Sequence, residues 1–167
     1  MSYDIWLEDP VTRKTIEVEE PHIMAGGTYA VGGTKELWLN ITYNYGSYYY
    51  EVFDDGIRSI YGKTGVDSIP MLQRMIDEIE GKYKKDGEWI STKRNIPKYY
   101  DSSGKEVDIY EAITKHPGEY VRSEITVDVN EGPNEDYWLA TAGNAIKPLY
   151  QLIAMAKMRP DGIWNGD

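Results

Sequence analysis

The chain has 167 residues, 41% hydrophobic and 28% charged, a composition typical of a globular protein with one core rather than a disordered tail. Its net charge of −10 disfavours a broad face for duplex nucleic acid, because such a face needs cations to displace phosphate counterions. With no cysteine and two histidines, the sequence excludes thiol chemistry, disulfides and cysteine-ligated metals, so we expect neither a metal nor a cofactor.

The amino-terminal segment lacks the basic start and apolar run of a signal peptide. Nowhere does the sequence hold the roughly 18 consecutive apolar residues that a membrane-spanning helix requires. The absence of cysteine fits a reducing compartment. We therefore expect a cytoplasmic protein without membrane contact.

The first third of the chain is predicted to be rich in strands. Polar and apolar residues alternate in Tyr3–Glu8 and Lys14–Glu20, which is typical of a hairpin, and again in Glu36–Tyr45. The glycine-rich stretch 26–34 between them predicts a loop or a bulged strand. A short turn then leads to Tyr48–Phe53, which is predicted to be the antiparallel neighbour of Glu36–Tyr45.

Two longer helices are predicted from apolar residues that recur every three or four positions, over Ile69–Tyr83 and from Asn144 to Met158. Asp108–Lys115 predicts a short helix and Glu119–Asn130 a strand. Residues 86–106 are rich in turn formers and predict a short hairpin or an excursion.

Because short turns separate most of the predicted strands, antiparallel pairing is favoured. The sequence predicts an α+β fold in which a single antiparallel sheet carries the two main helices on one face. We expect one domain over residues 1–167, with 82–130 as an excursion that varies between related proteins.

A shift of 77 residues superimposes the two main helices and their approaches, which suggests an internal strand–loop–helix repeat. Each helix entrance offers a hydroxyl and backbone N–H groups, from Thr64 and Gly65 in one and from Thr141, Gly143 and Asn144 in the other. Helix N-termini bind anions, so two adjacent entrances could hold the phosphates of a nucleotide. Ordinary capping of each helix explains the same residues.

Aromatic residues are the most unusual feature of the composition, with 15 tyrosines and five tryptophans but one phenylalanine. Rings with a polar tip are typical of protein interfaces, and they also stack on bases. An exposed sheet face rich in tyrosine explains the same bias. The candidates for a protein interface lie in one predicted hairpin: Trp38, Tyr43, Tyr45, Tyr48, Tyr49 and Tyr50.

Paired carboxylates such as Asp54 with Asp55, or Glu135 with Asp136, suggest a hydrolase as a further hypothesis. Adjacent residues of a strand point to opposite faces, however, and such pairs are common in turns. We assign no catalytic residue.

Several stretches resemble a family of small bacterial and prophage proteins that has no assigned activity. The resemblance includes an amino-terminal SYDIWLEDP-like strand and a carboxy-terminal YWxxTxGNA…RPDGxWxGD motif, and it leaves about 82–130 uncovered. The resembling stretches are 2–10, 26–33, 38–45, 65–72, 137–145 and 159–167. The prophage association implies a role in the conflict between phage and host.

We therefore expect a non-enzymatic binding protein, phage-borne or prophage-borne, that inhibits a host defence protein by covering a functional surface. The alternatives are sequestration of a nucleotide or nucleotide-like signalling molecule, and a hydrolase that uses carboxylates. A protein partner and a nucleotide ligand are the expected partners, and self-association is left open.

Overall fold

A computed structural model describes residues 1–22 and 33–167, which divide into two compact units. The larger unit comprises Met1–Ile90 and Glu131–Asp167, and the second, here called the ribbon unit, comprises Ser91–Asn130. The ribbon unit falls inside the segment 82–130, whose variability stays a prediction. The glycine-rich stretch 26–34, which was predicted to be a loop or a bulged strand, lies mostly outside the described residues.

The main sheet of the larger unit has three strands in the order β10-β1-β4. Its central strand β1 (Ser2–Glu8) is antiparallel both to β10 (Ile163–Gly166) and to β4 (Trp38–Thr42). Alternate side chains of β1 are fully buried, as expected for a strand with one face on the core. The strands predicted at Tyr3–Glu8 and within Glu36–Tyr45 are thus confirmed.

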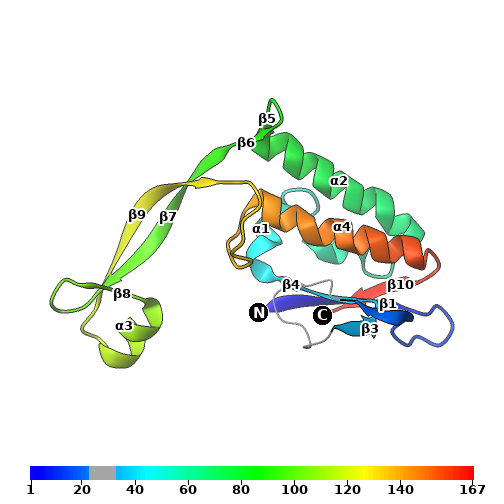
Figure 1. The fold of residues 1–167 in the computed structure, drawn as a ribbon, viewed down its shortest axis with the longest axis horizontal. Coiled ribbons are helices and arrows are strands. Elements are labelled where there is room, and N and C mark those ends of the chain that lie inside the picture. The colour runs from blue at the N-terminus through cyan, green and yellow to red at the C-terminus, as the bar shows by residue number, and fades with distance from the viewer. Residues whose placement is uncertain (23–32) are drawn as a thin grey trace. The chain divides into compact units, whose positions relative to one another are not determined.

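Both long helices begin earlier than the apolar pattern indicates. Helix α2 (Gly65–Tyr83) follows the N-cap Thr64, whose side chain accepts the N–H of Asp67. Helix α4 (Ala142–Met158) follows the N-cap Thr141, which accepts a bond from the third helical residue in the same way. The two helices lie side by side and run in opposite directions (Figure 1).

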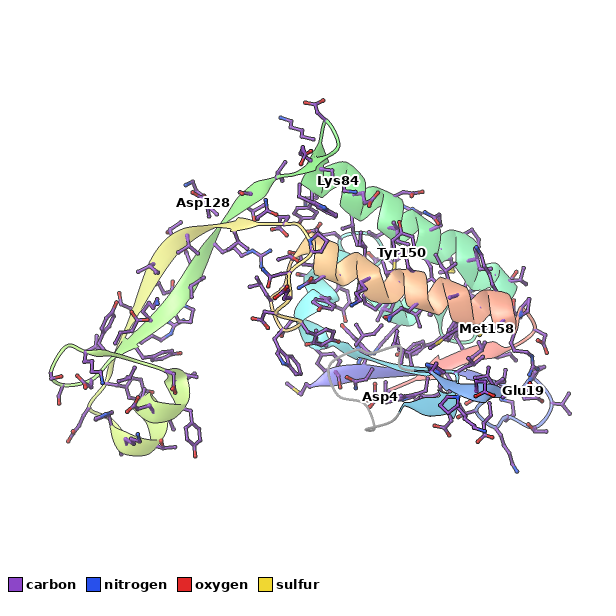
Figure 2. The ribbon with its side chains drawn as sticks, in the orientation of Figure 1. Asp4, Glu19, Lys84, Asp128, Tyr150 and Met158 are labelled. Carbon is purple, nitrogen blue, oxygen red and sulfur yellow. The ribbon has the colours of Figure 1, made fainter. Side chains whose placement is uncertain are left out.

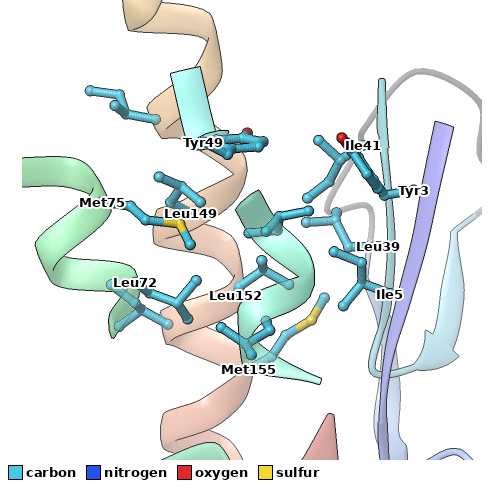
Figure 3. Packing of buried hydrophobic residues seen from close by; sticks show 14 of the residues in the cluster. Tyr3, Ile5, Leu39, Ile41, Tyr49, Leu72, Met75, Leu149, Leu152 and Met155 are labelled. Atoms are coloured by element: carbon cyan, nitrogen blue, oxygen red, sulfur yellow. The ribbon is translucent and has the colours of Figure 1, made fainter. Parts of the chain in front are cut away.

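The core of the larger unit lies between the sheet and the two helices. Figure 3 shows Leu149 and Leu152 of α4 between Leu72 and Met75 of α2 and Leu39 of the sheet. All five side chains are fully buried. Helix α4 therefore packs between α2 and the sheet, and α2 packs mainly on α4.

Shorter elements complete the larger unit. Strand β2 pairs with β3, and β5 pairs with β6, each pair antiparallel. These elements are β2 (Glu17–His22), β3 (Thr34–Glu36), the 3₁₀-helices η1 (Tyr43–Tyr45) and η2 (Gly56–Ile60), α1 (Gly46–Tyr50), β5 (Lys84–Lys85) and β6 (Glu88–Trp89).

The ribbon unit is built on two ten-residue strands, β7 (Ser91–Tyr100) and β9 (Val121–Asn130), which pair along their whole length. At the end of the ribbon where the chain connects the two strands, the short strand β8 (Glu106–Val107) adds to β7. Helix α3 (Ile109–Lys115) follows β8, and Asp108 caps it by accepting the N–H of Glu111. The predicted short helix and the strand before residue 130 are confirmed.

The predicted α+β class is confirmed, but the prediction of a single antiparallel sheet is wrong. The described residues form four α-helices and four separate sheets of two or three strands. The segment 48–53, predicted as a strand, contains the end of α1 instead. The ribbon strands pair with each other and with β8, so they form a sheet of their own rather than extending the main one.

The internal repeat also covers fewer elements than predicted. The two helices and their threonine caps correspond under the shift of 77 residues. The elements before them do not correspond, because η2 precedes α2, whereas β9 and a loop precede α4. Among the described residues, no helix combines the length and the apolarity needed to cross a membrane.

We predict that Leu152→Ala lowers the free energy of unfolding by about 2–5 kcal/mol, because it leaves a cavity between α2 and the sheet. Urea unfolding followed by circular dichroism measures the change. Val66→Ala, at an exposed position of α2, is the control and should change stability by less than about 0.5 kcal/mol. Equal effects of the two substitutions would contradict this packing.

Candidate functional site

The tyrosines predicted to form an interface lie mostly inside the protein. Of the six candidates, three are buried, namely Tyr45, Tyr48 and Tyr49. Two others, Trp38 and Tyr43, are half-buried, and Tyr50 is exposed. The predicted hairpin would have placed alternate rings on an outer face. The helical turns η1 and α1 instead direct three of them into the core.

The hydroxyls of the buried tyrosines hold the segment 131–145 against the core. Tyr49 donates to the carbonyl of Ala145 at 2.7 Å, and Tyr45 donates to the carbonyl of Tyr137. The Tyr48 hydroxyl lies 2.7 Å from Glu131 Oε2. These tyrosines thus recognise the protein's own chain, and their rings are not available to a partner.

Thr64 and Gly65 form a helix entrance that is already filled. The N–H groups of Gly65 and Val66 donate to the carbonyls of Gly162 and Pro160 at 2.8 and 3.0 Å. The next N–H, of Asp67, donates to Thr64 Oγ1. All three leading donors of α2 are satisfied within the chain, so this residue pair acts as an ordinary cap.

The entrance of α4 is filled by Glu131, which is almost completely buried. Its Oε2 accepts the N–H of Ala142 at 2.9 Å, and its carbonyl accepts the N–H of Gly143 at 2.7 Å. The N–H of Asn144 donates to Thr141 Oγ1. A buried carboxylate is favourable here because it meets the positive end of the helix.

The structure does not bring the two entrances together. Because α2 and α4 run in opposite directions, the start of α2 lies against the end of α4, where a Cβ on Gly65 would meet the carbonyl of Arg159 at 2.7 Å. Neither entrance offers a free leading N–H, and α4 already has an anion at its start. The structure therefore does not bring Thr64 and Thr141 together to form a two-phosphate site.

A pocket of about 520 Å³ lies beside the first half of α4, and it includes three of the residues predicted from the sequence. Those three are Tyr45, Gly143 and Asn144. We call this the α4 pocket. Its other lining residues are Pro133, Asn134, Glu135, Tyr137, Ile146, Lys147, Pro148, Tyr150 and Gln151. This size, with apolar and aromatic walls and a few polar groups, is typical of small-molecule sites.

Asn144 builds one wall of the α4 pocket. Its Oδ1 accepts the N–H of Asn134 at 2.8 Å, and its Nδ2 donates to the carbonyls of Asp136 and Leu139 at 3.0 and 2.9 Å. This amide therefore fixes the loop that follows Pro133. Gly143 permits the close approach, since a Cβ there would lie 2.2 Å from the nitrogen of Pro133.

One polar atom among the residues lining the α4 pocket has no partner. Gln151 Oε1 is buried, and no hydrogen-bond donor among the described residues reaches it. Unsatisfied buried acceptors are rare because leaving one without a donor costs about 1–3 kcal/mol. No pattern in the sequence marks this group, because a glutamine in a helix is usually solvated.

A second candidate surface is one face of the ribbon. The register of β7 with β9 places Val121, Ile125, Val127 and Val129 on the same face as Ile96, and this face also carries Thr92, Arg94, Lys98, Tyr100 and Ser123. Val121 is 62% exposed, Ile125 38% and Ile96 36%. We call this the apolar ribbon face. The alternating pattern of Glu119–Asn130 predicted the residues that β9 contributes to it, but strand β7, which contributes the others, was not predicted.

The opposite face of the ribbon is mostly polar, and side chains of its two strands contact each other. Lys93 pairs with Asp128 at 3.3 Å, and Thr126 Oγ1 lies 2.9 Å from Asn95 Oδ1. Figure 2 shows Asp128 on β9. The ribbon is therefore amphipathic.

The paired carboxylates that suggested a hydrolase lie in turns and loops. Asp136 Oδ1 accepts the N–H of Trp138 at 3.0 Å, which makes it a turn-forming residue, and Asp54 and Asp55 lie in a turn before η2. Within the described ranges, no group of three or more histidine, aspartate or glutamate side chains could hold a metal ion.

Comparisons of the chain with protein-family models, with curated proteins and with solved structures found no match.

We predict that the protein loses stability above about pH 10, where the tyrosines of the unfolded chain ionise. Burial raises the pKa of Tyr45 and Tyr49 well above that value, so the folded chain keeps protons that the unfolded chain releases. The contribution of these two tyrosines to the free energy of unfolding is then constant below pH 10 and falls as the pH rises toward their folded pKa values. Urea unfolding at several pH values, with tyrosinate absorbance, measures this. Complete ionisation near pH 10 without loss of fold would contradict it.

We further predict that Glu131→Ala lowers the free energy of unfolding by at least about 2 kcal/mol, because it strands the N–H of Ala142 and removes the carboxylate that accepts from Tyr48 at the start of α4. Thermal and urea unfolding measure the loss. Glu135→Ala, at an exposed position nearby, is the control and should change little. A Glu131→Ala protein as stable as the control would refute the role of this carboxylate.

Proposed function

We propose that the protein is a non-enzymatic binding protein that inhibits a partner protein by covering one of its functional surfaces, and that the apolar ribbon face makes the contact. The observation that carries the proposal is the exposure of Val121, Ile125 and Ile96 on one side of a ribbon whose other side is polar. Exposed apolar residues that polar and charged ones flank, here Arg94, Lys98 and Ser123, are typical of interaction sites.

The energetics of a two-stranded ribbon support this use. Two paired strands are marginally stable alone, because each residue is fixed in place while little apolar surface is buried. A partner seated on the apolar ribbon face would bury that surface and add stability that the ribbon unit lacks. Helix α3 adds further exposed apolar side chains, with Tyr110 74% and Ile113 54% exposed.

The class of partner is proposed from charge and from resemblance. The net charge of −10 favours a partner with a basic surface, such as the cleft of a nucleic-acid-binding protein. The resemblance to prophage proteins favours a partner from the host's defence against phage, met in the cytoplasm. The acidic residues would then steer the encounter while the apolar ribbon face supplies contact area.

The proposal predicts that Ile125→Lys abolishes partner capture. Immobilised wild-type protein and variants are incubated with a bacterial lysate, and bound proteins are quantified by mass spectrometry. Proteins enriched by the wild type should fall at least about ten-fold on Ile125→Lys, because a lysine on the apolar face opposes burial. Thr126→Lys adds the same charge on the neighbouring, polar-facing residue and should retain capture.

Circular dichroism of both variants verifies that the ribbon is folded. Equal enrichment on wild type and Ile125→Lys would contradict the proposal. So would a dimer of the wild type that Ile125→Lys alone dissociates, since the apolar ribbon face would then bind a second copy of the chain.

A further inference from the structure

We propose that the outer edge of β9 binds an extended segment of the partner protein, in which apolar residues alternate with basic ones. The segment joins the ribbon sheet as an added strand, held by backbone hydrogen bonds. This inference rests on the proposed function, because it states how the partner meets the ribbon.

The backbone of β9 has one edge without a partner strand. The ribbon sheet has the order β8-β7-β9, so no strand among the described residues pairs with the side of β9 that faces away from β7. The ten residue pairs of β7 with β9 follow one another without a bulge, and every residue of β9 is exposed or half-buried. A continuous row of accessible N–H and C=O groups is a template for another strand.

The register identifies which groups point outward. Along an antiparallel strand, residues that bond to the neighbouring strand alternate with residues whose N–H and C=O point away from it. The N–H of Glu131 donates to the carbonyl of Ile90, which continues the β7–β9 ladder by one pair. The even-numbered residues of β9 from 122 to 128 therefore point outward. Pro97 agrees with this count, because it lies opposite Glu124, at a position where a missing N–H leaves no gap in the ladder.

The outer edge of β7 is protected, whereas that of β9 is open. Along β7, Pro97 removes one outward N–H and β8 pairs with the last two residues. In the main sheet, the edge strand β10 is closed, since Trp164 exchanges backbone bonds with Gly62 and Lys63. Strand β9 contains neither proline nor lysine, the residues that most often block an edge. The fold thus leaves open an edge of the kind that it protects elsewhere.

The side chains beside this edge specify the residues of the added strand. On the apolar ribbon face, Ile125 favours an apolar residue directly opposite. On the other face, β9 carries the acids Glu124 and Asp128, 47% and 67% exposed, against one base, Arg122. Opposite charges across neighbouring strands are favourable and like charges are not, as the pair of Asp128 with Lys93 of β7 illustrates. The added strand therefore alternates apolar with basic residues.

Such a strand would supply what the ribbon lacks. Two paired strands alone are marginally stable, whereas three strands with an apolar face are not. The backbone bonds would contribute affinity, and the alternate side chains would contribute specificity. A basic segment also fits the net charge of −10, which favours a partner with a basic surface.

The probe is a blocked nine-residue peptide in which valine alternates with lysine and threonine, titrated into the full-length protein and followed by NMR. We expect a Kd below about 1 mM, and at least about three-fold weaker binding when glutamate replaces lysine. At saturating peptide, the amides of Glu124, Thr126 and Asp128 should exchange at least about ten-fold more slowly than in the free protein. The amides of Ile125 and Val127 bond to β7 and should be protected in both states.

Two proline variants test the edge itself. Thr126→Pro removes an outward N–H of β9, and Asn95→Pro removes the outward N–H directly opposite, on β7. Both variants also lose the contact of Thr126 Oγ1 with Asn95 Oδ1, so they are matched in their effect on the ribbon. Thr126→Pro should weaken peptide binding at least about ten-fold, whereas Asn95→Pro should leave it unchanged. Circular dichroism verifies the fold of both. A peptide N-methylated on the amides that face β9 should not bind the wild type, which tests the same bonds without a variant.

The inference is overturned if the peptide does not bind below about 1 mM, if Thr126→Pro or the N-methylated peptide binds like the parent, or if the outward amides gain no protection. A wild-type dimer that Thr126→Pro dissociates would also overturn it, because a second copy would then occupy the edge. The proposed function is tested separately. Lysate capture that Ile125→Lys abolishes and Thr126→Pro retains would leave that function standing and overturn only this inference.

Discussion

The larger unit depends on the hydrogen bonds of one buried glutamate. Glu131 is the residue at which the chain returns from the ribbon, and its N–H donates to the carbonyl of Ile90, where the chain left. Its carboxylate accepts from Tyr48 and from the first residue of α4, and its carbonyl accepts from the second. Burying a charge is costly unless donors surround it, and here the start of a helix and a tyrosine hydroxyl supply them.

This arrangement separates the part of the chain that is fixed from the parts available for recognition. The bond from Glu131 to Ile90 joins the two points at which the chain leaves the larger unit and returns to it. The ribbon unit can therefore carry exposed apolar residues that the core does not use. The tyrosine hydroxyls that hold 131–145 also hold in place the loop that forms one wall of the α4 pocket.

The local elements could be predicted from the sequence, whereas their assembly could not. Apolar spacing located α2 and α4, helix start and stop signals located α3, and alternation located β1, β4 and β9. Strand β7 was missed because its lysines, arginine and proline hide the pairing that β9 provides. The tyrosines after residue 44 have high strand propensity, yet hydroxyl bonds to a segment some 90 residues away hold them in helical turns. Of the candidate site, Tyr45, Gly143 and Asn144 were named, but the acceptor Gln151 depends on burial that a sequence does not display.

Glu131 fills the entrance of α4 from within the chain, and the packing of the larger unit depends on this contact. Amide hydrogen exchange of Ala142 and Gly143, followed by NMR in ligand-free protein at neutral pH, tests this most directly. We expect both amides to exchange as slowly as those in the middle of α4, because each donates to a buried oxygen. Exchange at the rate of an unstructured peptide would contradict it.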